Sequence, residues 1–133
     1  MSIVYALEPN LSAEAFRAVL VASTLGERRP VHDLPRLEKM LRAADIVVTA
    51  RDAGRLVGIS RAISDFSFCC YLSDLAVDAA YQRQGIGRRL IAETHAAAGR
   101  NTTLVLIAAP AAERYYPRIG MIARSGWVIP RVE

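Results

Sequence analysis

The sequence predicts an α/β fold, in which helices flank both faces of one mixed β-sheet. Strand-like and helix-like segments follow one another in the order β-α-α-β-β-β-α-β-α-β(-β). Two strand-like segments separated by Asp52-Ala53-Gly54 predict an antiparallel hairpin. A helix-like segment between the strand-like residues 71–77 and 103–108 predicts a parallel pair. A sheet with both kinds of pairing is mixed.

Capping residues and turns set the boundaries of the elements in the first half of the chain. Ser12 and Asp33 can accept hydrogen bonds from the first turns of two helices, and Pro35 fits the first turn of the second. Gly58, inside a strand-like segment, predicts a bulge or a close backbone neighbour. The expected elements are a strand over 3–7, helices over 13–22 and 34–44, and strands over 46–51 and 56–63.

The second half continues the alternation. Residues 66–77 lead into a strand, a helix follows over about 85–98, and Gly99-Arg100-Asn101 ends it. Residues 103–108 are apolar without interruption, which predicts a strand buried on both faces and central in the sheet. A short helix over 111–119 and one or two short strands within 122–129 complete the chain.

Length and composition favour a single domain that spans residues 1–133. The chain is 53% apolar and 23% charged, as in ordinary soluble proteins. The longest apolar stretch, Leu104–Ala112, is shorter than the roughly 18 residues that cross a bilayer. The first residues lack the basic start and apolar core of a signal peptide. We therefore expect a cytoplasmic protein with no membrane partner.

Arginine dominates the positive charge. The net charge is +4, and Lys39 is the only lysine. A planar guanidinium can bind two phosphate oxygens at once. Because the arginines are scattered, with few aromatic residues between them, a small phosphorylated ligand is expected and nucleic acid is not. Cys69 and Cys70 are the only cysteines and are expected to be buried, so neither a disulfide framework nor a thiolate metal site is expected.

The stretch that follows residues 71–77 has the features of a pyrophosphate-binding loop. Gly85 and Gly87 lie at the start of a helix, where backbone N–H groups lack partners and the helix dipole favours an anion. Glycine lets a phosphate approach the backbone closely. Arg83 and the pair Arg88-Arg89 add positive charge around this turn.

Two common nucleotide-binding patterns do not fit this loop. A Rossmann fingerprint requires a third glycine where this chain has Leu90, and a P-loop requires Lys-Ser/Thr where it has Arg88-Arg89. The remaining motif, Gln82-x-x-Gly85-x-Gly87, resembles the acetyl-CoA motif of the GNAT superfamily of N-acetyltransferases. A second block, R-Y-Y-P-R-I-G-M over 114–121, is similar to the family's aromatic-Tyr-x-x-x-Gly-aromatic segment.

This resemblance implies a GNAT-like fold and an acyltransferase that uses acetyl-CoA as co-substrate. The acetyl group would pass to a primary amine of a small molecule or protein by direct attack in a ternary complex. Tyr116 would protonate the departing thiolate, and Tyr115 would pack in the core. The backbone of Leu75, Ala76 and Val77 would bind the pantetheine arm. The pyrophosphate would be bound by Gln82, Arg83, Gln84, Gly85, Ile86, Gly87 and Arg88.

The general base is left open by the resemblance. Many family members carry Glu where this chain has Tyr71. Asp74 is one candidate, and Asp65 or a chain of water molecules are the others. Simple alternation along the strand places Asp74 on the opposite face from Tyr71, but a bulge would change that.

Two further expectations follow from departures from the family pattern. The missing Glu, together with Ala109 at a position where the family often has Asn, motivates an alternative function as a non-catalytic acyl-CoA-binding or regulatory module. The short C-terminal region leaves the acceptor side either open or completed by a second subunit, so a homodimer is one expected assembly.

Overall fold

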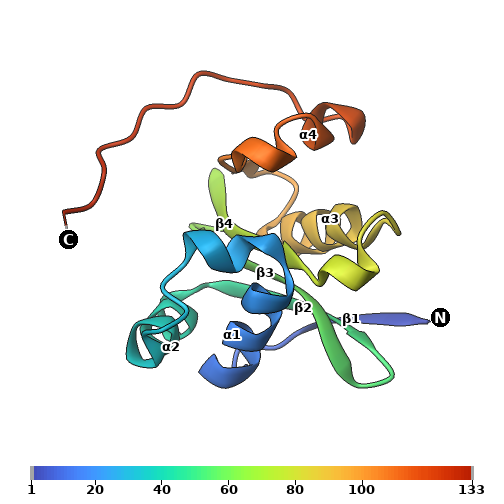
Figure 1. Ribbon diagram of the computed structural model, residues 1–133. Helices are drawn as coiled ribbons and strands as arrows, with labels where there is room; N and C mark the ends of the chain where they lie inside the picture. The colour runs from blue at the N-terminus through green and yellow to red at the C-terminus, as the bar shows by residue number, and fades with distance from the viewer. Residues whose placement is uncertain (1, 133) are drawn as a thin grey trace.

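The computed structural model describes residues 2–132 and contains a five-stranded mixed sheet (Figure 1). The strands lie in the order β1-β2-β3-β4-β5. The first three pairings are antiparallel and the fourth, between β4 and β5, is parallel, which confirms the predicted mixed sheet. The strands are β1 Ile3–Leu7, β2 Ile46–Asp52, β3 Arg55–Ser64, β4 Cys69–Val77 and β5 Thr103–Val105.

Helices cover both faces of the sheet, as predicted (Figure 1). The predicted N-caps are confirmed, because the Ser12 side chain accepts the Ala15 N–H and the Asp33 side chain accepts the Arg36 N–H. The α-helices are α1 Ala13–Ala22, α2 Leu34–Ala43, α3 Ile86–Ala98 and α4 Tyr115–Arg118, and the 3₁₀ helices are η1 Thr24–Arg28, η2 Ala79–Tyr81 and η3 Pro110–Ala112.

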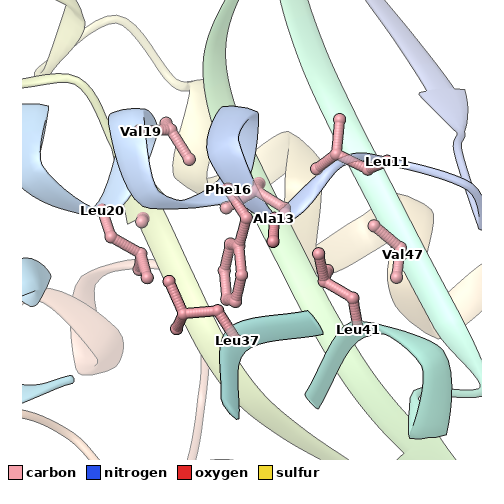
Figure 2. Close-up of a cluster of buried hydrophobic side chains, with 10 residues drawn as sticks. Leu11, Ala13, Phe16, Val19, Leu20, Leu37, Leu41 and Val47 are labelled. Atoms are coloured by element: carbon pink, nitrogen blue, oxygen red, sulfur yellow. The ribbon is translucent and has the colours of Figure 1, made fainter. Parts of the chain in front are cut away.

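The apolar face of α1 and α2 forms the first core. Phe16 and Leu20 of α1 meet Leu37 and Leu41 of α2 (Figure 2). The sheet residue Ile59 belongs to the same cluster, and all five are buried. Burying one such side chain stabilises a fold by roughly 1.5–3 kcal/mol. This core fixes the segment between α1 and α2, which includes Arg29, against β3 and β4.

The opposite face of the sheet packs against α3. Ile86 and Leu90 of α3 contact β2 and β3, and Gly58 is the point of closest approach. A Cβ atom on Gly58 would lie 3.1 Å from Leu90 Cδ1 and 3.3 Å from Ile86 Cγ2. The register between β2 and β3 also shifts after Ala50, so the predicted bulge is present. The close neighbours of Gly58 are side-chain atoms, and the alternative prediction of a close backbone neighbour is not what the structure shows.

The prediction of a central strand over residues 103–108 is wrong. β5 pairs only with β4, through three residue pairs, and lies at the edge of the sheet. Val105 is 50% exposed and Ile107 is 63% exposed. The apolar run that suggested burial on both faces therefore continues beyond the strand into solvent.

The C-terminal region also differs from the expectation. The predicted helix over 111–119 is replaced by the two short helices η3 and α4, and residues 119–132 form neither helix nor strand. No strand forms within 122–129. This segment extends away from the rest of the molecule (Figure 1), so β5 gains no neighbour from it.

Candidate functional site

An open strand edge begins where β4 and β5 separate. Their pairing ends at Tyr71, whereas β4 continues to Val77. Over residues 72–77 the edge of β4 that would face β5 has no strand partner among the described residues. An unpaired edge can bind an extended ligand through main-chain hydrogen bonds. The backbone of Leu75, Ala76 and Val77 lies on this edge.

This open edge leads directly to the N-terminus of α3. Gly85 caps the helix with φ +82°, and Arg83 also has a positive φ of +64°. The first helical bond runs from the Arg89 N–H to the Gly85 carbonyl. In the described part of the chain, the N–H groups of residues 83–87 have no backbone acceptor. These N–H groups lie next to one another at the start of α3, where a helix N-terminus favours an anion.

The loop before α3 is held by its own side chains. Asp78 is buried, and its carboxylate accepts the Ala80 N–H at 2.9 Å. The Gln82 side-chain amide donates to the Val77 carbonyl at 3.2 Å, and the Tyr81 hydroxyl donates to Asp52 at 2.8 Å. Gln82 thus connects the open strand end to the glycine turn.

The arginines of this turn have different surroundings. Arg89 pairs with Glu93 at 3.1 Å and lies over the Tyr5 ring. Arg83 and Arg88 are exposed, and within residues 2–132 neither forms an ion pair. They are the two cations available to a phosphate here.

The rings of the two tyrosines of α4 meet edge-on, with their centroids 5.3 Å apart. The Tyr115 hydroxyl lies 3.3 Å from where a Cβ of Gly87 would be. Tyr115 is only half-buried, so its predicted place in the core is wrong. Burial raises the pKa of Tyr116, and the neighbouring Tyr115 raises it further. Tyr116 is therefore protonated at neutral pH, as a proton donor must be.

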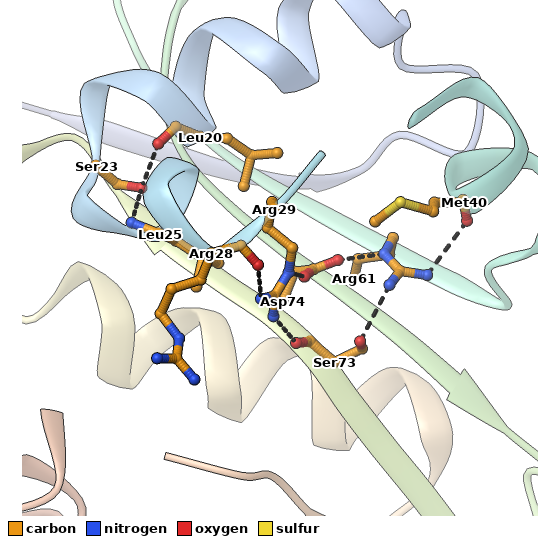
Figure 3. Close-up of polar contacts among 9 residues, drawn as sticks. All are labelled: Leu20, Ser23, Leu25, Arg28, Arg29, Met40, Arg61, Ser73 and Asp74. Carbon is orange, nitrogen blue, oxygen red and sulfur yellow. Dashed lines mark hydrogen bonds and ion pairs between the residues drawn. The ribbon is translucent and has the colours of Figure 1, made fainter. Parts of the chain in front are cut away.

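Asp74 is fully buried between two arginines (Figure 3). One carboxylate oxygen accepts the Arg29 Nε–H and the other accepts the Arg61 Nε–H. Arg29 also donates to the Ser73 carbonyl at 2.8 Å, and Arg61 donates to the Ser73 hydroxyl at 3.0 Å. Both arginines of the Arg29–Asp74–Arg61 cluster therefore also bind Ser73, the residue that precedes Asp74.

A bulge in β4 places Asp74 on the same face as Tyr71. Asp74 pairs with Arg61 and Tyr71 pairs with Ile63, but Leu72 already pairs with Ala62. Ser73 is thus the extra residue, and it reverses the alternation between positions 71 and 74. The sequence left open whether a bulge interrupts the alternation between Tyr71 and Asp74, and the structure contains this bulge.

Asp65 lies at the other end of β4 from the glycine turn. It closes the turn between β3 and β4, where its Oδ1 accepts the N–H groups of Ser67, Phe68 and Cys69. These bonds lower the pKa of Asp65 from 3.8 to about 2. Cys69 is exposed, contrary to the prediction that both cysteines are buried, whereas Cys70 is buried.

Arg29 and Arg61 were not identifiable as site residues from motifs. Arg61 lies opposite Asp74 only because of the Ser73 bulge, since a regular β3–β4 register would pair it with Ser73. Arg29 reaches the same carboxylate from the α1–α2 connection, 45 positions away, and carries no local signal.

Within residues 2–132, no group of three or more His, Cys, Asp or Glu side chains is placed to hold a metal ion. None of the described helices has the length and apolar character needed to cross a membrane.

Comparison with known proteins links this geometry to a family. The sequence matches the acetyltransferase (GNAT) domain over residues 22–126. A comparison with curated protein sequences gave no significant match. An acetyltransferase of the GNAT family from Streptococcus pneumoniae has a similar structure, with a TM-score of 0.80, 21% identity, and coverage of 99% of this chain and 100% of that one.

Two other solved structures show the same fold. A probable acetyltransferase from methicillin-resistant Staphylococcus aureus has a TM-score of 0.77 and 23% identity, covering 98% of this chain and 100% of that one. An aminoglycoside N-acetyltransferase in complex with CoA has a TM-score of 0.75 and 15% identity, covering 98% of this chain and 95% of that one. From the family match over most of its length, this chain belongs to the GNAT family of acetyltransferases.

Proposed function

We propose that this protein is an N-acetyltransferase that moves the acetyl group of acetyl-CoA to a primary amine. The observation that carries the proposal is the continuity between the open edge of β4 and the N-terminus of α3. The edge offers main-chain groups to a pantetheine arm, and the turn at residues 83–88 offers amides and two free arginines to a pyrophosphate. A related GNAT structure was solved with CoA, which supports this ligand class.

The chemistry assigned to the site is direct attack. The neutral amine attacks the thioester carbonyl carbon, the carbon–sulfur bond breaks, and the sulfur takes a proton. We assign that proton to Tyr116, whose raised pKa keeps the phenol protonated. Holding both reactants in one orientation can supply roughly 7–11 kcal/mol of the barrier reduction. The amides of Leu75 and Ala76 are the expected donors to the carbonyl oxygen.

Asp74 was a candidate base, and its surroundings assign it a different role in this proposal. Both carboxylate oxygens already accept hydrogen bonds from guanidinium groups, and the side chain is buried. We assign Asp74 to holding the Ser73 bulge, which sets the direction of the open edge. The proton lost by the attacking amine then passes to a chain of water molecules, the alternative that does not require a free carboxylate.

The test is release of free thiol from acetyl-CoA over a panel of primary amines. Tyr116→Phe is expected to lower kcat at least tenfold while the Kd for CoA stays within twofold. Tyr115→Phe is the matched control, because it removes a neighbouring hydroxyl from the same short helix. If Tyr116→Phe keeps full turnover and Tyr115→Phe does not, the proton donor is Tyr115 and the assignment to Tyr116 is wrong.

The second candidate is a non-catalytic acyl-CoA-binding module. The engagement of Asp74 by Arg29 and Arg61 favours it, because that carboxylate is unavailable as a base. Calorimetry that detects CoA binding, together with no acetyl transfer to any amine tested, would establish this function. Turnover with one amine excludes it.

A further inference from the structure

Helices α1 and α2 cover only part of the sheet face on which they pack. On β3 the cover reaches Arg61, which is buried and donates to the Met40 carbonyl of α2. On β4 it reaches Asp74, which is buried as well (Figure 3). The next residues on the same face are exposed, Ile63 by 46% and Tyr71 by 40%. The sheet face therefore has an open area where α1 and α2 end.

An apolar strip, defined as Ile63, Tyr71 and Val105, crosses this open area. Tyr71 of β4 pairs with Ile63 of β3 and with Val105 of β5, so the three side chains share one face. The neighbouring residues Cys70 and Leu104 pack on the opposite face, with the core beneath α3. Val105 is 50% exposed, and none of the three carries a charge. Neighbouring strands lie about 4.8 Å apart, so the strip is about 10 Å long.

The apolar strip borders the open edge of β4. Tyr71 and Val105 form the last residue pair before β4 and β5 separate, and the open edge begins at the next residue, Leu72. A thioester bound along this edge lies next to the strip on the same sheet. Small-molecule sites are mostly apolar, and the strip supplies an apolar wall beside the reacting bond. The strip is thus placed to contact the second reactant, the amine.

The charges around the strip disfavour a ligand with several cationic groups. On the side of α1 and α2, the Arg29–Asp74–Arg61 cluster combines two guanidinium groups with one carboxylate. Toward the β3–β4 turn, the Asp45 carboxylate accepts a backbone N–H of β3, and Asp65 accepts three N–H groups of the turn. Both carboxylates are therefore engaged. A second ammonium group on the strip would lose its water against apolar side chains, whereas an apolar body gains from the same burial.

We infer that the acceptor is a primary amine with a single positive charge and an apolar body, such as an aromatic ring on a short alkyl chain. The inference rests on the proposed acetyl transfer. The body packs on the apolar strip, with Tyr71 at its centre, and the amine points along β4 toward the thioester. Its nitrogen bonds to the acetyl carbon and loses a proton to water, while the carbon–sulfur bond breaks and the sulfur takes a proton from Tyr116. Polyamines and aminoglycosides, with several ammonium groups, are expected to be poor acceptors.

The first experiment compares phenethylamine with spermidine and kanamycin in the thiol-release assay. The value of kcat/KM is expected to be at least tenfold higher for phenethylamine. A preference for spermidine or kanamycin would overturn the inference and leave the proposed acetyl transfer intact. If no amine is acetylated, the proposed transfer fails, and calorimetry on the CoA-bound protein decides the inference. Tighter binding of phenethylamine than of spermidine would then support it, and equal or weaker binding would overturn it.

Substitutions of Tyr71 test whether the strip contacts the amine. Tyr71→Ala is expected to raise the KM for phenethylamine at least tenfold and to leave the KM for acetyl-CoA within twofold. Tyr71→Phe keeps the ring and is expected to stay within threefold of wild type for both. Val4→Ala is the matched control, because Val4 is also an exposed apolar strand residue but lies on β1, at the other edge of the sheet. An unchanged KM for phenethylamine in Tyr71→Ala would contradict the inference.

A charge placed on the strip tests the basis of selectivity. Val105→Glu adds a carboxylate at a half-exposed position, and Val105→Gln adds a side chain of similar size without the charge. Val105→Glu is expected to raise the ratio of kcat/KM for spermidine to that for phenethylamine at least tenfold over Val105→Gln. Circular dichroism and melting temperatures check that both variants fold. Equal ratios in the two variants would show that the strip does not select the acceptor.

Discussion

The Tyr115 phenol oxygen lies 3.3 Å from where Gly87 would carry a Cβ atom, so α4 closes over the first turn of α3. Burial raises the pKa of Tyr115, although the charge of Arg88 acts against that rise. The Tyr115 phenol therefore stays protonated beside the turn that is proposed to bind the pyrophosphate.

The close approach at Gly87 predicts a graded loss of CoA binding. A Cβ atom there would lie 3.3 Å from the Tyr115 hydroxyl and 3.9 Å from Val77 Cγ2, so alanine needs only a small shift of Tyr115, whereas the larger, branched side chain of valine needs more room. We expect Gly87→Ala to weaken CoA binding severalfold and Gly87→Val to weaken it more than tenfold. Isothermal titration calorimetry measures both, and unchanged melting temperatures separate the effect from unfolding. If Gly87→Ala and Gly87→Val bind CoA with equal affinity, the size of the side chain at position 87 has no effect, which would argue against a phosphate at this turn.

The Arg29–Asp74–Arg61 cluster predicts a large stability effect at a position that was a candidate base. Asp74→Asn leaves two guanidinium groups without their shared anion, and breaking a buried ion pair costs about 3–5 kcal/mol. We expect a loss of about that size in the free energy of unfolding, measured with urea. Arg55→Met is the control: the Arg55 side chain is 66% exposed, and Asp78 keeps its hydrogen bond from the Ala80 N–H, so the loss should be below about 1 kcal/mol.

The outcome at Asp74 also separates its two possible roles. If Asp74 holds the Ser73 bulge, Asp74→Asn should lower kcat/KM without changing the shape of the pH profile of kcat/KM. An Asp74→Asn protein that is as stable as wild type but loses the acidic limb of that profile, where a general base becomes protonated, would restore Asp74 as the general base.

Local chemistry made much of the fold predictable from sequence. Ser12 and Asp33 mark helix starts because a side-chain cap needs only the next three residues, and both caps form. The glycine turn before α3 was recognisable for the same reason. The exposed position of residues 103–108 at the edge of the sheet was not predictable in this way. Burial of a strand depends on its neighbouring strands, and residues 119–132 do not form a neighbouring strand.

The candidate site likewise has one part that local sequence predicts and one part that depends on tertiary packing. Gly85 and Gly87 form a contiguous motif, so their place at the start of α3 followed from spacing. The partners of Asp74 come from the α1–α2 connection and from β3, and their meeting depends on packing of α1 and α2. The face of Asp74 depends on one extra residue, Ser73, which no alternation pattern reveals.

The turn at Asp65 predicts an acid-sensitive contribution to stability. Its pKa is lowered from 3.8 to about 2 in the folded protein, so its contribution is present above about pH 4 and is lost as the pH falls toward 2. Asp65→Asn keeps an oxygen for the N–H groups but removes the charge. We expect a shallower decline in stability between pH 4 and pH 2 in urea titrations, with Asp33→Asn as a control at another capping carboxylate. A decline as steep as in wild type would contradict this.

The buried hydroxyl groups of Ser60 on β3 and Thr94 on α3 are hydrogen-bonded to each other. We expect substitutions at these two residues to lower the free energy of unfolding by different amounts. The Thr94 hydroxyl donates to the Leu90 carbonyl at 2.7 Å, so the Ser60 hydroxyl, 2.7 Å away, must donate to Thr94. Both residues are fully buried. Thr94→Val keeps the shape but leaves the Ser60 proton without an acceptor, which costs about 1–3 kcal/mol. Ser60→Ala removes only the donor, so it should cost less.

The double variant tests this direction of donation. In Ser60→Ala/Thr94→Val no buried hydroxyl remains without a partner, so its loss of unfolding free energy should be smaller than the sum of the two single losses. A coupling of at least about 0.5 kcal/mol in urea unfolding is expected for residues in contact. Strict additivity, or a larger loss for Ser60→Ala than for Thr94→Val, would contradict the assignment of Ser60 as donor.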